Sequence, residues 1–216
     1  MKHLISFNND SQLKDDLLLE VKRHEELDMI VQGHYGRENG KWTGCKVGCS
    51  IHSLNKIKGL DYRTDDHSAY ESGFGVSRII ARLTDRIFEG LPKERMKTFP
   101  FEFWSAVPVG KNLDNVWRKF LIWLLVDPQT GVIKHAADDQ QRKAIQDVAD
   151  LLERSLVEKI TPEQFREVHN AARAAAAAYA AAAYAYAYAA AYAAAAARKQ
   201  RFVTMADKLI ELLQAA

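Results

Sequence analysis

The chain has 216 residues, of which 48% are hydrophobic and 27% charged, and its formal net charge is +2. This charge argues against a nucleic-acid partner, because nucleic-acid-binding domains usually concentrate basic residues on one face. Two cysteines are too few for a secreted disulfide scaffold, and the N-terminus shows no apolar signal segment. We therefore expect a cytoplasmic protein with reduced thiols.

Hydrophobic periodicity predicts an all-α fold, a helical bundle with irregular N-terminal loops and one very long C-terminal helix. Helices are expected over about 13–31, 77–88, 113–126 and 138–159. The first should bury a stripe formed by Leu13, Leu17, Val21 and His24. The second should bury Ile79, Ile80, Leu83 and Ile87. Prolines 92, 100 and 108 are expected to divide the chain between the second and third helices into short pieces.

We expect residues 1–160 to form one helical globular domain that contains an irregular segment, residues 33–75. Five of the 11 glycines fall between Gly33 and Gly48, and a polar, charged stretch follows from about Asn55 to Gly75. Irregular segments of this length are uncommon in compact domains and often carry function. The sequence therefore favours this segment as the location of any site.

Residues 161–216 are expected to form the long helix. Thr161, Pro162 and Gln164 fit a capping box with proline at the first helical position. Residues 174–197 contain only alanine and tyrosine, and alanine has the highest helix propensity. A membrane span is not expected, because alanine is weakly apolar and the tyrosines lie in mid-segment. So large an uncharged surface predicts packing on the domain or on another subunit, hence a homo-oligomer.

The stretch around the two cysteines suggests a zinc site. Cys45, Cys49 and His52 could share one helix face, and His67 could complete a tetrahedral set, because zinc prefers thiolate and imidazole ligands. The alternative is that both cysteines are small buried residues packed beside glycines. We expect no cofactor in that case.

A second set of residues suits a small anionic ligand. His67 and Tyr70 lie in one polar stretch, and Arg78 and Arg82 begin an arginine ridge with four-residue spacing. Imidazole and guanidinium groups bind phosphate oxygens well. The alternative is a solvated face, on which Asp85 and Glu89 pair with the arginines three residues before them. The predicted ligand-binding residues are His52, His67, Tyr70, Arg78 and Arg82.

Several stretches together resemble a family of hypothetical proteins encoded in phage and prophage genomes. They are Trp42…Gly44-Cys45…Val47-Gly48-Cys49…His52, His67–Glu71, Ile87–Pro92, Val107–Gly110, the alanine-rich helix and Met205–Leu209. The resemblance covers most of the chain. It implies a viral accessory protein that acts in the cytoplasm of a bacterial host by binding.

Three hypotheses of function follow. The first is a non-enzymatic binding protein, a phage counter-defence factor that sequesters a small anionic nucleotide signal. The sequence contains no dinucleotide-binding, phosphate-loop, nucleophile-elbow or metalloprotease motif, so we assign no catalytic residue. The second is a metal-dependent or hydrolytic enzyme centred on Cys45, Cys49, His52 and His67. The third is a protein–protein inhibitor of a host factor.

Overall fold

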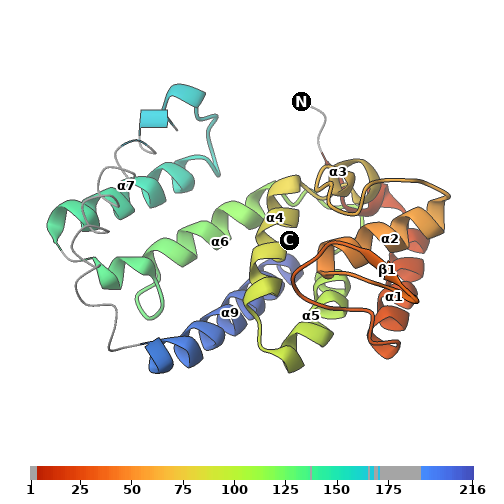
Figure 1. Ribbon diagram of the computed structural model, residues 1–216. Coiled ribbons are helices and arrows are strands. Elements are labelled where there is room, and N and C mark those ends of the chain that lie inside the picture. Colours follow the sequence, from red (N-terminus) through yellow and green to blue (C-terminus); the bar gives the residue numbers. More distant parts are fainter. Residues whose placement is uncertain (1–3, 137, 165, 168–169, 171–190) are drawn as a thin grey trace. The chain divides into compact units, whose positions relative to one another are not determined.

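The structure of the protein, a computed structural model, describes residues 4–136, 138–164, 166–167, 170 and 191–216. The chain divides into two compact units: unit 1 is residues 1–117 with 197–216, and unit 2 is residues 118–196. Both units are helical, and the strands of the described chain form one short hairpin (Figure 1). The predicted all-α class is confirmed. No helix among these residues is long and apolar enough to cross a membrane.

A 3₁₀ turn, η1 (Ser6–Asn9), leads into helix α1 (Ser11–Glu26). The Asp10 side chain caps α1 by accepting a hydrogen bond from the Leu13 amide at 3.0 Å. The predicted buried stripe is confirmed: Leu13, Leu17, Val21 and His24. The helix ends at Glu26 rather than near Val31, and Asp28 has the left-handed φ of 50°.

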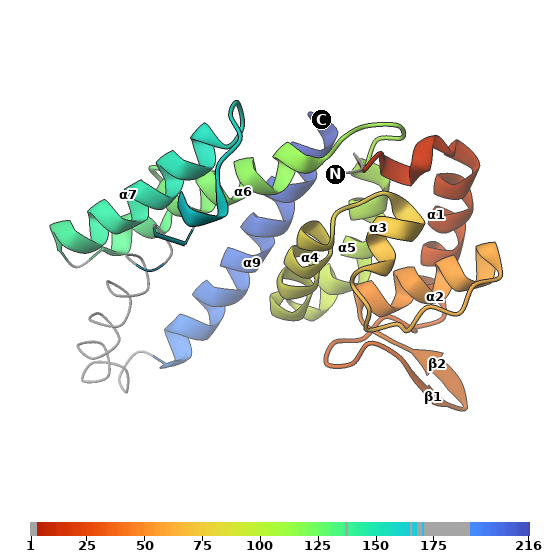
Figure 2. The same cartoon turned by 90° about the horizontal axis from the view of Figure 1, so that it is seen from above.

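The segment 33–75 is more regular than predicted. Strands β1 (Arg37–Asn39) and β2 (Lys41–Thr43) form a hairpin that projects from the body of unit 1 (Figure 2). Helix α2 (Lys46–Lys58) and the short helix α3 (Ala69–Phe74) follow. Gly48 lies inside α2. A Cβ at this position would be 1.5 Å from the carbonyl oxygen of Tyr35, so only glycine allows the two segments to pack this closely. It is a close-packing glycine and not a helix breaker.

Helix α4 (Arg78–Gly90) confirms the second predicted helix, and Ile80 and Ile87 of its predicted buried face are buried, but Ile79 and Leu83 are not. Ile79 is 44% exposed, whereas the buried side chains of α4 are Ile80, Ala81, Thr84, Ile87 and Phe88. The buried face differs from the predicted one because the small side chains of Ala81 and Thr84 pack inward, and the prediction considered only large apolar residues.

Helix α5 (Lys93–Ala106) corrects the prediction of short pieces between prolines. Pro92 precedes the helix, Pro100 lies inside it, and Pro108 follows it. Pro100 removes one backbone hydrogen bond, which disfavours a helix interior. Burial of the aromatic side chains on both sides of it, Phe99, Phe103 and Trp104, offsets this cost.

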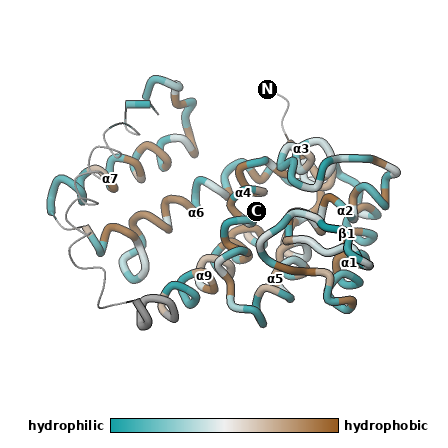
Figure 3. The backbone as a smooth tube through the Cα atoms, in the orientation of Figure 1, coloured by the Kyte–Doolittle hydropathy of each residue, from teal (hydrophilic) through white to brown (hydrophobic). Residues whose placement is uncertain are grey.

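The core of unit 1 is aromatic. The Trp104 ring lies 4.5–5.7 Å, centroid to centroid, from four other rings, those of Phe7, Tyr70, Phe74 and Phe103. Helix α9 (Ala191–Gln214) adds the buried side chains of Ala206, Leu209 and Leu213. Figure 3 shows hydrophobic and hydrophilic residues alternating along the helices, as amphipathic helices require.

Helix α6 (Asp114–Val126) starts in unit 1 and continues into unit 2, where η2 (Val132–His135) and α7 (Asp139–Arg154) follow. The capping box is confirmed: the Gln164 side chain accepts from the Thr161 amide at 2.8 Å, and the Thr161 hydroxyl accepts from the Gln164 amide at 3.3 Å. Residues 171–190 lie outside the described residues, so continuity of the long helix, its packing and the boundary at residue 160 stay predictions.

Candidate metal centre

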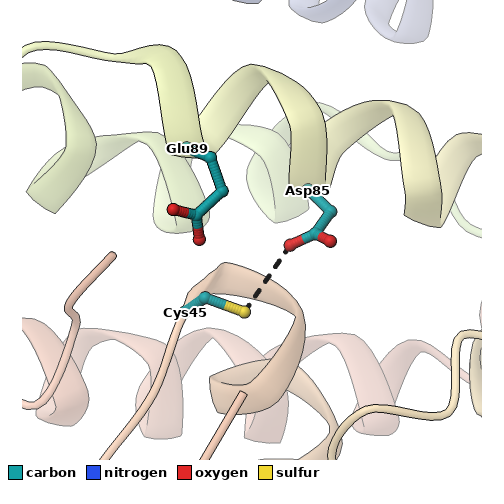
Figure 4. Close-up of side chains that lie close together, drawn as sticks. All are labelled: Cys45, Asp85 and Glu89. Atoms are coloured by element: carbon teal, nitrogen blue, oxygen red, sulfur yellow. Dashed lines mark hydrogen bonds between the residues drawn. The ribbon is translucent and has the colours of Figure 1, made fainter. Parts of the chain in front are cut away.

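Three potential metal ligands meet between α2 and α4. Asp85 and Glu89 are one turn apart on α4 and share a face, and Cys45 is the N-cap residue of α2. The Cys45 sulfur lies 3.6 Å from Oδ1 of Asp85 (Figure 4). One ligand atom from each residue lies within 4.8 Å of the other two. Two elements distant in sequence thus bring a thiol and two carboxylates together.

Two further side chains hold the Asp85 carboxylate. The Tyr35 hydroxyl donates a hydrogen bond to Oδ2 of Asp85 at 2.8 Å, and Nε2 of His67 lies 3.3 Å from the same oxygen. The Tyr35 and His67 rings meet edge to face at 5.6 Å. Both donors approach Oδ2, so Oδ1 is the oxygen that faces the Cys45 sulfur.

The cluster combines a buried thiol with more accessible carboxylates. Burial raises the pKa of the Cys45 thiol to about 12, and the negative charge of Asp85 adds to this shift. Burial also raises the pKa of Glu89, and Asp85 acts in the same direction, against the Gly33 amide that donates to Glu89. Glu89 is exposed, so the cluster can be reached from solvent.

The structure separates the four residues predicted to bind zinc. Cys45 and His67 both contact Asp85. The Cys49 sulfur is fully buried and donates to the Gly44 carbonyl at 3.3 Å, as the buried-residue interpretation predicts. His52 lies against His24 instead, with Nδ1 3.2 Å from Nε2 of His24.

The predicted ligand-binding residues do not converge on one place either. Tyr70 is fully buried beside Trp104, and His52 and His67 have separate partners. The Arg78 guanidinium forms a two-point ion pair with Glu71 at 2.9 and 3.0 Å. Arg82 is exposed on α4.

Asp85 and Glu89 were missed because the sequence favoured ion pairs with Arg82 and Arg86. That expectation is wrong: Asp85 binds Tyr35, Cys45 and His67, and Glu89 accepts from the Gly33 amide. The available signal was their four-residue spacing, which places two carboxylates on one helix face.

An open pocket of about 390 Å³ is lined in part by Tyr35, the residue that donates to Asp85. Its lining is Tyr35, Gly36, Arg63, Thr64 and Asp65. The positively charged residue of the pocket is Arg63, whose guanidinium is already paired with Asp65 at 2.8 and 3.0 Å.

No family model matches the chain, and no curated protein or solved structure is significantly similar to it. The side chains of the cluster are therefore the basis for assigning a function.

Proposed function

We propose that the protein binds a divalent transition-metal ion of the Zn²⁺ type through the Cys45 sulfur and the carboxylates of Asp85 and Glu89. The observation that carries this proposal is the approach of the three ligand atoms to within 4.8 Å of one another. Ligands that share a tetrahedral zinc ion lie about 3.5 Å apart, given bond lengths of about 2.0–2.3 Å. Small side-chain rotations would bring these atoms to that spacing.

The electrostatics of the cluster favour a cation. Asp85 carries a negative charge close to the carboxyl of Glu89, and the pKa of Glu89 is raised partly by that charge. A bound cation would remove this repulsion. It would also displace the proton of the Cys45 thiol to solvent, because a coordinating thiol is deprotonated outright. Three negative ligands would then face one doubly charged ion.

Tyr35 and His67 serve as orienting residues in this arrangement. Both contact Oδ2 of Asp85, at 2.8 and 3.3 Å, and so present Oδ1 to the ion. Hydrogen-bonded partners of this kind fix the direction of metal ligands in proteins. The protein would thus supply three ligands and leave a fourth position to water or to a bound molecule, as in catalytic zinc sites.

The thiol determines which metals the site selects. Thiolate is a soft ligand that suits Zn²⁺ and Co²⁺, whereas Mg²⁺ and Ca²⁺ prefer sites made only of oxygen atoms. We therefore expect Zn²⁺ to bind at a concentration at which Mg²⁺ does not.

Titration with Co²⁺ tests the site directly, because a bound thiolate gives an intense charge-transfer absorption that oxygen ligands do not. Wild type and Cys49→Ser should show this absorption, with one equivalent of Co²⁺ bound, and Cys45→Ser should lack it. Cys49→Ser is a matched control, since Cys49 is the other buried thiol and lies outside the cluster. An absorption that survives in folded Cys45→Ser would refute the site.

A second candidate function is the binding of a small anionic ligand, such as a nucleotide signal, in the pocket beside Tyr35. The candidate site is the open pocket of about 390 Å³, where an anion would have to compete with Asp65 for the Arg63 guanidinium. Incubation with nucleotides, followed by recovery after denaturation, would separate sequestration from cleavage, and Arg63→Gln should lower retention. A phage counter-defence role, inhibition of a host protein and homo-oligomer formation stay predictions from the sequence.

A further inference from the structure

The closest ring contact between the β1–β2 hairpin and the helices of unit 1 is an aromatic stack on Trp42. The Trp42 ring of β2 stacks on the His52 ring of α2, with centroids 4.1 Å apart and an interplanar angle of 11°. It also lies 5.6 Å from the His24 ring of α1. Residues 37–41 of the hairpin are exposed. The Lys41 amine adds a surface contact by donating to the Leu27 carbonyl at 2.9 Å.

An additional proton on the histidine pair beneath Trp42 would have no hydrogen-bond acceptor in the part of the chain that the structure describes. Nε2 of His24 and Nδ1 of His52 are 3.2 Å apart and share one hydrogen bond. Nδ1 of His24 is buried and has no hydrogen-bond partner among the described residues. Orphaned buried N–H groups are rarer than orphaned acceptors, so we assign the shared proton of the neutral pair to Nε2 of His24. A further proton on His24 would create a buried, unpaired N–H.

The charged groups around the pair do not compensate such a proton. Glu20 on α1 favours a charged form of both rings, but it is already bound by Lys56 at 2.6 Å and lies 3.7 Å from Arg23. Lys56 on α2 and Arg23 on α1 both disfavour a second positive charge on the rings. Glu38 on β1 favours a charged His52, but it is exposed to solvent.

We propose that the hairpin Arg37–Thr43 is an acid-sensitive latch: protonation of the His24–His52 pair releases Trp42 and opens the hairpin. Opening hydrates both rings and so gives the added N–H groups water as a partner. Burial explains why protonation should favour the open hairpin, since it lowers the pKa of His24 from 6.5 to about 4 and also lowers that of His52. The His24 shift alone would raise the ratio of open to closed hairpin by at most about 300-fold.

The latch also regulates the metal centre, an extension that rests on the proposed function. The hairpin lies between Tyr35, which orients Asp85, and Cys45, the thiol ligand. The Cys45 amide donates to the His34 carbonyl at 2.7 Å and so joins the two ends of the hairpin segment. The Gly44 amide donates to the Met29 carbonyl at 3.0 Å and ties the second end to the chain after α1. Opening the hairpin strains these ties, and the site loses affinity.

Fluorine NMR of protein labelled with 5-fluorotryptophan tests the latch without any metal. The chain has four tryptophans, and Trp42→Phe identifies the Trp42 resonance. Between pH 7.5 and 4.5 this resonance should move to the position of a solvent-exposed ring while the other three stay unchanged. In His24→Leu the movement should be lost or its midpoint displaced to lower pH. His52→Gln provides a second test if His24→Leu does not fold.

The latch is overturned if the Trp42 resonance stays unchanged to pH 4.5, or if all four resonances move together, which indicates global unfolding. The regulatory link has its own measurement, the dissociation rate of Co²⁺ at pH 5. It should be at least tenfold faster in wild type than in His24→Leu, and equal rates would refute the link. Absence of Co²⁺ binding at neutral pH would refute the metal centre and not the latch. The fluorine NMR result would still decide whether the latch exists.

Discussion

The Nζ atom of Lys46 lies 3.5 Å from the centre of the Phe103 ring, in the core of unit 1. The side chain is fully buried, and the Tyr70 and Trp104 rings lie 5.0 and 4.9 Å from the same nitrogen. The nitrogen also donates to the Tyr70 hydroxyl and to the Thr84 hydroxyl, at 3.2 and 3.1 Å. Burial holds the pKa of Lys46 well below its usual range, and this outweighs the attraction of Asp85.

We expect Lys46→Met to raise the free energy of unfolding by about 1–3 kcal/mol in urea denaturation, because methionine fills a similar volume without burying an amine. The two hydroxyls keep other partners: Tyr70 has Ser50, and Thr84 donates to the Ala81 carbonyl at 2.9 Å. Lys46→Ala is the matched control and should lose about 2–5 kcal/mol through its cavity. A clear loss of stability in Lys46→Met would show that the amine contributes more than its burial costs.

Stability should fall as the solution is acidified. The pKa of His24 is lowered from 6.5 to about 4 in the folded protein, so the fold favours the neutral ring. The stabilisation is complete above pH 6.5 and is lost as the pH falls towards 4, by at most about 2–3 kcal/mol at pH 4.5, and by less where the hairpin opens first. Urea denaturation at pH 7.0 and 4.5 measures this loss. Replacing His24 with leucine should remove most of the difference, and an unchanged difference would assign the acid sensitivity to other groups.

Zn²⁺ affinity should depend on Tyr35 although that residue is not a ligand. Tyr35→Phe removes the hydroxyl that donates to Asp85 at 2.8 Å, and we expect affinity to fall about 10–100-fold. The charge-transfer absorption with Co²⁺ should persist, because Cys45 is unchanged. Tyr62→Phe is a suitable control, as it removes a tyrosine hydroxyl outside the cluster. Equal affinities in the two variants would exclude an orienting role for Tyr35.

Periodicity predicted those features that depend on local sequence. The stripe of α1 and the capping box at Thr161 follow from side-chain spacing and short-range hydrogen bonds, and both are present. Helix α5 was missed because Pro100 is locally unfavourable in a helix, whereas Phe99 and Phe103 are buried only by distant segments. The face of α4 was misjudged because Thr84 looks polar, yet its hydroxyl is satisfied inside the core.

The candidate metal centre was half predictable. Cys45 and His67 stood out by residue type, and the structure brings both to Asp85. Asp85 and Glu89 did not stand out, because Arg82 and Arg86, three residues before them on the helix, were the partners expected from the sequence. Only the packing of α2 on α4 decides between the two sets of partners, and that packing depends on contacts distant in sequence. Neighbouring residues on a helix therefore gave the wrong partners for these carboxylates.

Gly48 should be the glycine on which the site depends most. A Cβ at this position would lie 1.5 Å from the Tyr35 carbonyl oxygen and 2.5 Å from its carbonyl carbon, so Gly48→Ala must displace the Tyr35 backbone. We expect a loss of about 1–3 kcal/mol in stability from overpacking, together with a fall in Zn²⁺ affinity as the Tyr35 hydroxyl leaves Asp85.

Gly40→Ala provides the comparison. Gly40 has a φ of 74° in the hairpin turn and no atom within 4 Å of its Cβ position, so alanine there should cost only about 1 kcal/mol of backbone strain. Zn²⁺ affinity should stay at the wild-type level, since nothing presses on Tyr35. Isothermal titration of both variants with Zn²⁺ at pH 7.5, beside urea denaturation, separates the two effects. If Gly48→Ala lowers stability but binds Zn²⁺ as tightly as Gly40→Ala, the metal centre tolerates displacement of Tyr35. In that case Cys45, Asp85 and Glu89 hold the ion without its help.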